Sequence, residues 1–72
     1  MSDNISQGAI KVLEIIGISS KNFDDAIHQG VNKAAESVKG ITGVEVLKQS
    51  AKIKDGKPYQ YNAHLKVAFV VK

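Results

Sequence analysis

The alternation of apolar and polar residues is clearest in the last part of the chain, over residues 59–71. Every odd-numbered residue of this segment is apolar or aromatic, from Tyr59 to Val71. The even-numbered residues are polar from Gln60 to Lys66 and become apolar at Ala68. A repeat of two is typical of a β-strand, whose successive side chains point to opposite faces of the sheet. The pattern therefore predicts a long strand with one apolar face.

Two other strands and one helix are predicted before this segment. Residues 9–16 are rich in β-branched side chains, and residues 44–53 show a weaker pattern of the same kind. Between them, apolar residues recur at steps of three and four, which is the spacing of one face of a helix: Phe23, Ile27, Val31, Ala34 and Val38. The sequence therefore predicts a helix over residues 23–39 and the element order β-α-β-β.

Glycine and capping residues indicate where these elements end. Gly17 is predicted to close the first strand and to open a turn over residues 17–22. Asn22 is predicted to cap the helix N-terminus, with Asp25 three residues later as in a capping box. Gly40 follows the last predicted helical residue, where a glycine commonly ends a helix.

The connections restrict how the strands are arranged. Asp55 and Gly56 form a dipeptide typical of a two-residue hairpin turn, which makes the second and third strands antiparallel. The helix returns the chain, so the first and second strands run parallel and are joined by a right-handed crossover. The third strand then fits between them. We predict an α+β fold in which a three-stranded antiparallel sheet of order 1-3-2 wraps on one helix.

A comparison of lengths indicates that the chain assembles with copies of itself. The thirteen residues of the last strand span about 43 Å, whereas the seventeen residues of the helix span about 25 Å. One helix therefore cannot cover the whole apolar face of the sheet. The 72-residue chain has no cysteine, so disulfides cannot stabilise this small domain. A homo-oligomer is the prediction that remains.

The charged residues argue against a nucleic-acid partner. The formal net charge is +3, and all ten basic residues are lysine. The chain thus lacks arginine, whose planar group grips phosphate and guanine with two hydrogen bonds. Four lysines lie close together in the sequence: Lys48, Lys52, Lys54 and Lys57. We interpret this cluster as the solvated end of the hairpin, with a ligand-binding patch as the weaker alternative.

Domain organisation and location follow from the same patterns. Residues 1–8 are polar and are predicted to form a disordered tail, and residues 9–72 are predicted to form a single domain. No segment approaches the roughly 20 apolar residues of a membrane span. We predict a cytoplasmic protein without a membrane partner.

No motif indicates catalysis. His28 falls on the predicted helix and His64 on the last strand, and neither belongs to a sequence motif that supplies a nucleophile or an acid partner. Glycine-rich nucleotide-binding motifs do not occur. His64 instead shares the polar face of its strand with Gln60, Asn62 and Lys66, which indicates a wet interior or a binding surface. We predict a binding protein and not an enzyme.

Three segments resemble the elements of one known family. The first comprises residues 12–17 with Ser19, the second residues 23–27 and 34–38, and the third residues 45–46, Tyr61 and residues 65–69. Together they cover about residues 11–71, and their order and spacing are similar to those of the dodecins. The resemblance implies a hollow shell of twelve identical subunits that stores a flavin (riboflavin, FMN or FAD) between subunits without turnover.

The resemblance also assigns a binding site. The stacking tryptophan of the family falls on Gly43, and its hydrogen-bonding glutamine falls on Asn62. Gly43, Val44, Asn62 and His64 are therefore the candidate residues for a planar, flavin-type ligand. The alternative is a shell of the same fold that binds no flavin and for which a cation such as calcium is the candidate ligand. Its candidate oxygen ligands are Asp24, Asp25, Glu45 and Asp55, although no calcium-binding loop motif is present.

Overall fold

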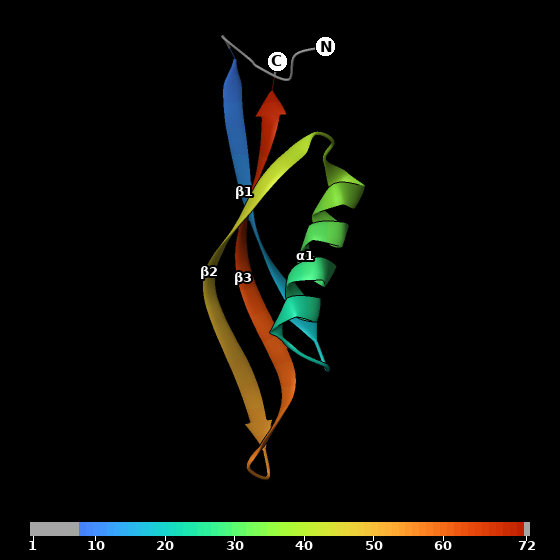
Figure 1. The fold of residues 1–72 in the computed structure, drawn as a ribbon, viewed down its shortest axis with the longest axis vertical. Coiled ribbons are helices and arrows are strands. Elements are labelled where there is room, and N and C mark those ends of the chain that lie inside the picture. The colour runs from blue at the N-terminus through green and yellow to red at the C-terminus, as the bar shows by residue number, and fades with distance from the viewer. Residues whose placement is uncertain (1–7, 72) are drawn as a thin grey trace.

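The computed structural model of the chain describes residues 8–71. Its elements are β1 (Ala9–Ser19), α1 (Phe23–Ser37), β2 (Ile41–Lys54) and β3 (Lys57–Val71), as Figure 1 shows. The predicted tail of residues 1–8 lies, except for Gly8, outside the described residues, so the tail and the domain boundary stay predictions. Within residues 8–71, no helix has the length and apolar composition that crossing a membrane requires.

The sheet has the predicted topology. Its strand order is β1-β3-β2, and β3 pairs antiparallel with both neighbours. The turn between β2 and β3 consists of Asp55 and Gly56, whose φ angles of 53° and 76° are both positive. A two-residue turn with two positive φ angles matches the right-handed twist of the strands that it joins. The predicted α+β fold and the hairpin are therefore confirmed.

The turn predicted over residues 17–22 starts later than predicted, because β1 continues through Gly17 to Ser19 and only residues 20–22 connect it to α1. Gly17 is buried in an extended strand and does not adopt a positive φ angle. It is needed for another reason. A Cβ atom on Gly17 would overlap the Ala26 carbonyl oxygen and would lie 2.8 Å from the Gly30 nitrogen. The absence of side chains at Gly17 and Gly30 thus lets α1 pack directly on the backbone of β1.

The start of α1 is held by Asn22 and Ser19. The Asn22 side chain accepts a hydrogen bond of 2.7 Å from the backbone nitrogen of Asp25, as predicted for an N-cap. The Asp25 carboxylate accepts a hydrogen bond of 2.7 Å from the Ser19 hydroxyl. The Ser19 hydroxyl also accepts from the backbone nitrogen of Lys21 at 2.9 Å. The end of β1 and the first turn of α1 are therefore tied together by one buried hydroxyl.

The end of α1 differs from the prediction. The helix stops at Ser37, and Val38 is already extended, with φ −131° and ψ 150°. Gly40 therefore does not directly follow the helix, although its φ of 77° is positive. The Gly40 carbonyl accepts a hydrogen bond of 3.3 Å from the backbone nitrogen of Val70. Gly40 thus already pairs with β3, immediately before β2 begins at Ile41.

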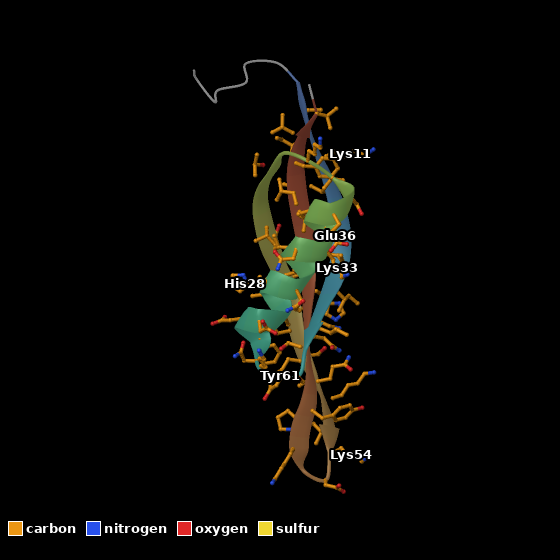
Figure 2. The ribbon with its side chains drawn as sticks, turned by 90° about the vertical axis from the view of Figure 1, so that its right-hand side faces the viewer. Lys11, His28, Lys33, Glu36, Lys54 and Tyr61 are labelled. Atoms are coloured by element: carbon orange, nitrogen blue, oxygen red, sulfur yellow. The ribbon has the colours of Figure 1, made fainter. Side chains whose placement is uncertain are left out.

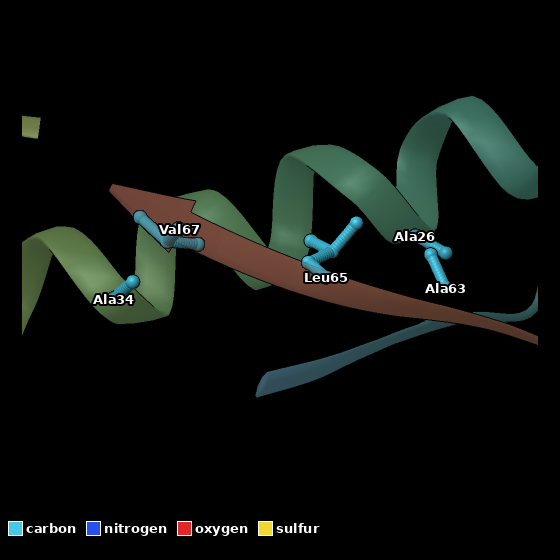
Figure 3. Close-up of a cluster of buried hydrophobic side chains, with 5 residues drawn as sticks. All are labelled: Ala26, Ala34, Ala63, Leu65 and Val67. Atoms are coloured by element: carbon cyan, nitrogen blue, oxygen red, sulfur yellow. The ribbon is translucent and has the colours of Figure 1, made fainter. Parts of the chain in front are cut away.

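The hydrophobic core is small and lies between α1 and the centre of β3. Ala63, Leu65 and Val67 of β3 face Ala26 and Ala34 of α1, and all five are at most 2% exposed (Figure 3). These three strand residues belong to the odd-numbered face that the sequence predicted to be apolar. Because the buried helix residues are glycine and alanine, the helix lies close to the sheet.

Much of the apolar surface stays uncovered. The chain extends 52 Å along its longest axis, whereas the fifteen residues of α1 span only about 22 Å. Large hydrophobic side chains that remain 42–61% exposed are Ile10, Val12, Ile16, Ile18, Val44, Val46, Leu47, Ile53, Tyr59 and Val71. Within this set, Ile10, Val12, Ile16 and Ile18 share one face of β1, and a run of this kind is rarely left exposed on a monomeric soluble protein. The fold therefore agrees with the length comparison on which the prediction of a homo-oligomer was based.

We expect Gly17→Ala to destabilise the protein strongly. The new methyl group would overlap the backbone of α1, and overpacking of this kind costs about 1–3 kcal/mol when side chains can adjust. Gly43→Ala is the matched control, because a Cβ atom there meets nothing within 4 Å. The control should change the free energy of unfolding by less than about 0.5 kcal/mol. Urea unfolding at one fixed protein concentration measures both, and equal stabilities would contradict the close packing of α1 on β1.

We also expect stability to depend on pH through Asp25. The hydrogen bond from Ser19 lowers the pKa of the Asp25 carboxyl, and Gln29, Lys21 and His28 lower it further. A lowered pKa in the folded state means that the ionised carboxylate stabilises the fold above its ordinary pKa. This stabilisation is lost as the pH falls through the lowered value.

The variant Ser19→Ala should therefore lose more stability at pH 7 than at pH 3, relative to the wild type. Ser20→Ala, which removes an exposed hydroxyl next to it, is the control. Unfolding midpoints in urea at the two pH values supply the comparison. A loss for Ser19→Ala that is the same at both pH values would show that the hydrogen bond to Asp25 has no such role.

Candidate functional site

The sheet has one face that α1 does not cover, and we call it the open face. It carries the even-numbered side chains of β1 and β3, because the odd-numbered ones point toward the helix. The register places three β1 residues opposite β3 partners there: Glu14 opposite Lys66, Ile16 opposite His64 and Ile18 opposite Asn62. On the other side of β3, Glu45 lies opposite Lys66, Lys48 opposite His64 and Ser50 opposite Asn62. The polar positions of β3 are thus flanked by side chains from both neighbouring strands.

The polar residues of β3 form a half-buried row on the open face. Gln60, Asn62, His64 and Lys66 all have intermediate exposure, although they lie on the central strand. The Gln60 Nε2 atom donates a hydrogen bond of 2.9 Å to Asn62 Oδ1. Among the hydrogen bonds within residues 8–71, none uses Nδ2 of Asn62 or Oε1 of Gln60. The two amides therefore retain a donor and an acceptor for a ligand.

Three of the four predicted site residues share the open face. Gly43 lies opposite Ala68, so it belongs to the same face as Asn62 and His64. Val44 lies opposite Val67 and points to the helix side, where it is 44% exposed. Ala68 lies six positions after Asn62 on β3, which is about 20 Å along the strand. Gly43 and Asn62 of one chain thus cannot contact the same small ring system.

Gly43 leaves open space where the resemblance places an aromatic side chain. A Cβ atom at this position would have no heavy atom within 4 Å, and its φ is not in the positive range. A larger side chain would therefore fit on the single chain. The native glycine supplies no stacking surface, which leaves the polar row as the part of the predicted site that can hold a ligand.

A shallow depression lies beside the polar row. Its volume is about 250 Å³, and its lining residues are Glu14, Ile15, Ile16, His64 and Leu65. Sites that enclose small molecules generally measure about 300–1,000 Å³. Glu14 and Ile16 at its rim are exposed. A planar ligand placed here would therefore stay largely in solvent unless a second copy of the chain covered it.

The candidate metal ligands are not brought together. Asp24 and Asp25 lie at the start of α1, Glu45 lies on β2 and Asp55 lies in the hairpin turn. Within residues 8–71 no three His, Asp or Glu side chains are grouped so that they could hold a metal ion. The four candidate oxygen ligands therefore do not form a common site within one described chain.

The two histidines also lie apart. His28 is exposed on α1 (Figure 2), whereas His64 belongs to the open face on the other side of the sheet. Neither forms a hydrogen bond to a nucleophilic or acidic side chain within residues 8–71. The arrangement offers polar and apolar binding contacts, without an assembled acid–base pair.

The sequence did not indicate the neighbours of the polar row. Ile16 and Ile18 lie beside His64 and Asn62, and Glu14 with Glu45 flank Lys66. The parity of β1 could have indicated that Ile16 and Ile18 share a face. Their alignment with particular β3 residues depends on the register, which no pattern within one strand reveals.

Comparison with known proteins gives one consistent result. The family model described as Dodecin matches residues 9–72. Among solved structures, dodecin from Streptomyces davaonensis is 27% identical with a TM-score of 0.88, covering 93% of this chain and 98% of that one. Dodecin from Streptomyces coelicolor is 25% identical with a TM-score of 0.90, covering 94% and 97%. A comparison with curated protein sequences gives no match.

A third similar structure is described by its ligand. It is a calcium-chelating immunodominant antigen from Mycobacterium tuberculosis, called calcium dodecin, with a novel calcium-binding site. It is 28% identical with a TM-score of 0.77, and the alignment covers 89% of this chain and 91% of that one.

Proposed function

This chain belongs to the dodecin family, and from this premise we propose that it is a non-catalytic storage module that holds a flavin-type ligand between its own copies. The family is known for small-molecule binding and for oligomer assembly. The proposal adds three finer points: a shell of twelve subunits, a planar flavin (riboflavin, FMN or FAD) as the ligand, and a cytoplasmic location. No catalytic step is part of it.

Self-assembly is supported by the distribution of apolar surface. α1 packs on β1 and β3, so Val44 and Val46 of β2 stay exposed on the helix side of the sheet. On the open face, Ile10 and Val12 of β1 stay exposed as well. Copies of the chain would remove both surfaces from water, which is worth about 25 cal/mol for each Å² of apolar area.

The observation that carries the ligand proposal is the half-buried amide pair of Gln60 and Asn62 beside His64. One amide orients the other through the 2.9 Å hydrogen bond, which leaves a donor and an acceptor available on the open face. Ile16 and Ile18 supply apolar surface in the neighbouring strand. A flavin ring has the matching properties, since its edge is polar and its faces are apolar.

The residues of the candidate site match a flavin ring only in part. Asn62 and His64 would contact the polar edge of the ring, and Gly43 with Val44 of another copy would lie over its face. Gly43 contributes no aromatic stacking, which is worth about 0.5–1.5 kcal/mol for each pair. We therefore expect weaker binding than an aromatic side chain at this position would give.

The second candidate function is a shell that binds a cation such as calcium and no flavin. The similarity to the calcium dodecin of Mycobacterium tuberculosis favours it, as does the open space at Gly43. Elemental analysis of the purified protein after extensive dialysis tests this alternative. Calcium that stays bound in a fixed ratio to the number of chains would support this alternative. Protein without calcium would contradict it, and the flavin proposal would then stand alone.

Titration of flavin fluorescence tests the main proposal. We expect the wild-type protein to quench riboflavin or FMN saturably, with a Kd on the order of micromolar. Asn62→Ala should weaken binding about five- to tenfold, because it removes a hydrogen bond to the ring and leaves Gln60 unpaired. Asn32→Ala, the same change on the exposed surface of α1, is the control and should leave the Kd unchanged.

Gly43→Trp serves as a positive control for the position of the site. It should bind flavin about two- to tenfold more tightly than the wild type. If Gly43→Trp quenches flavin and the wild type does not, the site is formed but flavin is not the natural ligand. If Asn62→Ala and Asn32→Ala bind equally well, the polar row does not contact the ligand.

A further inference from the structure

The four clustered lysines lie on one face of the β2–β3 hairpin, which we call the lysine face. On β2, Lys48 lies opposite His64 and Lys52 lies opposite Gln60, so both belong to the open face. Lys54 follows Lys52 by two residues and therefore shares its side, and it lies opposite Lys57. Figure 2 shows Lys54 at the tip of the hairpin, far from Lys11 at the other end of the chain. The four lysines that lie close together in the sequence therefore also share one surface in the structure.

The positive charge of this face is not neutralised within the described chain. All four lysines are exposed, and within residues 8–71 none of them forms an ion pair; the pair that exists is Lys33 with Glu36 on α1. Asp55 in the turn is the one carboxylate between residues 46 and 65. Lys54 and Lys57 are direct cross-strand partners, an arrangement that is unfavourable for like charges. A bound anion would remove this repulsion.

The spacing of the lysines suits an extended anion. Lys52 and Lys54 are about 7 Å apart along β2, and Lys48 lies about 13 Å beyond Lys52. Several charges along one line match a chain of phosphates better than a single phosphate group. The lysine ammonium binds phosphate as a point charge and needs no particular orientation.

The composition of the lysine face distinguishes between kinds of phosphate chain. Its cross-strand neighbours on β3 are Gln60, Asn62 and His64, whereas Tyr61 lies opposite Ala51 and belongs to the helix side of the sheet. None of the residues paired directly with these lysines is Phe, Tyr or Trp, the side chains on which the bases of single-stranded nucleic acids mainly stack. The face also lacks arginine. We propose that the lysine face binds a linear polyphosphate without bases, independently of any ligand at the polar row.

A binding assay with matched charge variants tests this proposal. The probe is a fluorescently labelled inorganic polyphosphate of defined length, and the protein is the full chain in its native assembly. The test variant changes Lys52, Lys54 and Lys57 to glutamine, which avoids Lys48 beside His64. The control variant changes Lys11, Lys21 and Lys39 to glutamine as well. These three lysines are exposed and lie off the lysine face. Both variants lose three positive charges, and size-exclusion chromatography checks that each assembles like the wild type.

We expect the test variant to lose at least about tenfold in affinity at 50 mM salt and the control variant to lose less than about twofold. Wild-type affinity should fall about 20- to 50-fold between 50 and 200 mM salt, as for three or four released counterions. A single-stranded oligonucleotide with the same number of phosphates should bind no more tightly than polyphosphate.

Three results would overturn the proposal. Equal losses in the two variants would show that only the total charge matters. An oligonucleotide that binds more tightly than polyphosphate would indicate a nucleic-acid surface. Failure of the wild-type assembly to bind polyphosphate at 50 mM salt would show that the lysine face is solvated surface.

Discussion

The close contact between α1 and β1 at Gly17 and Gly30 fixes where the helix lies on the sheet. Because neither residue has a side chain, the helix lies directly on the strand backbone, over β1 and β3. It is then too short and too far to one side to cover β2 or the ends of the sheet. The exposed apolar surface, and with it the need for partner copies, follows from where this contact places the helix.

The open face combines two surfaces with different chemistry. Around Asn62 and His64, amide groups lie next to isoleucine side chains of β1, a combination that suits a planar ligand with a polar edge. Toward the hairpin turn, the same face carries lysines without carboxylate partners in the described chain. The role that we propose for each surface is binding, which agrees with the non-catalytic character of the dodecin family.

The sequence predicted the elements better than their contacts. Strict alternation over residues 59–71 located β3, and Asp55 with Gly56 located the hairpin, since these signals are local. The continuation of β1 through Gly17 was missed because Gly17 packs against Gly30 of α1, which lies thirteen residues later in the sequence. The separation of Gly43 from Asn62 was missed for a similar reason. It depends on the register of β2, which shifts at irregularities near Gly43 and Leu47 that no simple pattern encodes.

One chain leaves much of its apolar surface exposed, and we expect it to be stable only together with its copies. The mass of the purified protein by sedimentation velocity, measured over a hundredfold dilution series, tests this most directly. We expect one species many times heavier than the 7.7 kDa chain that persists on dilution, and a dodecamer is the expected size. A folded 7.7 kDa monomer at every concentration would contradict it.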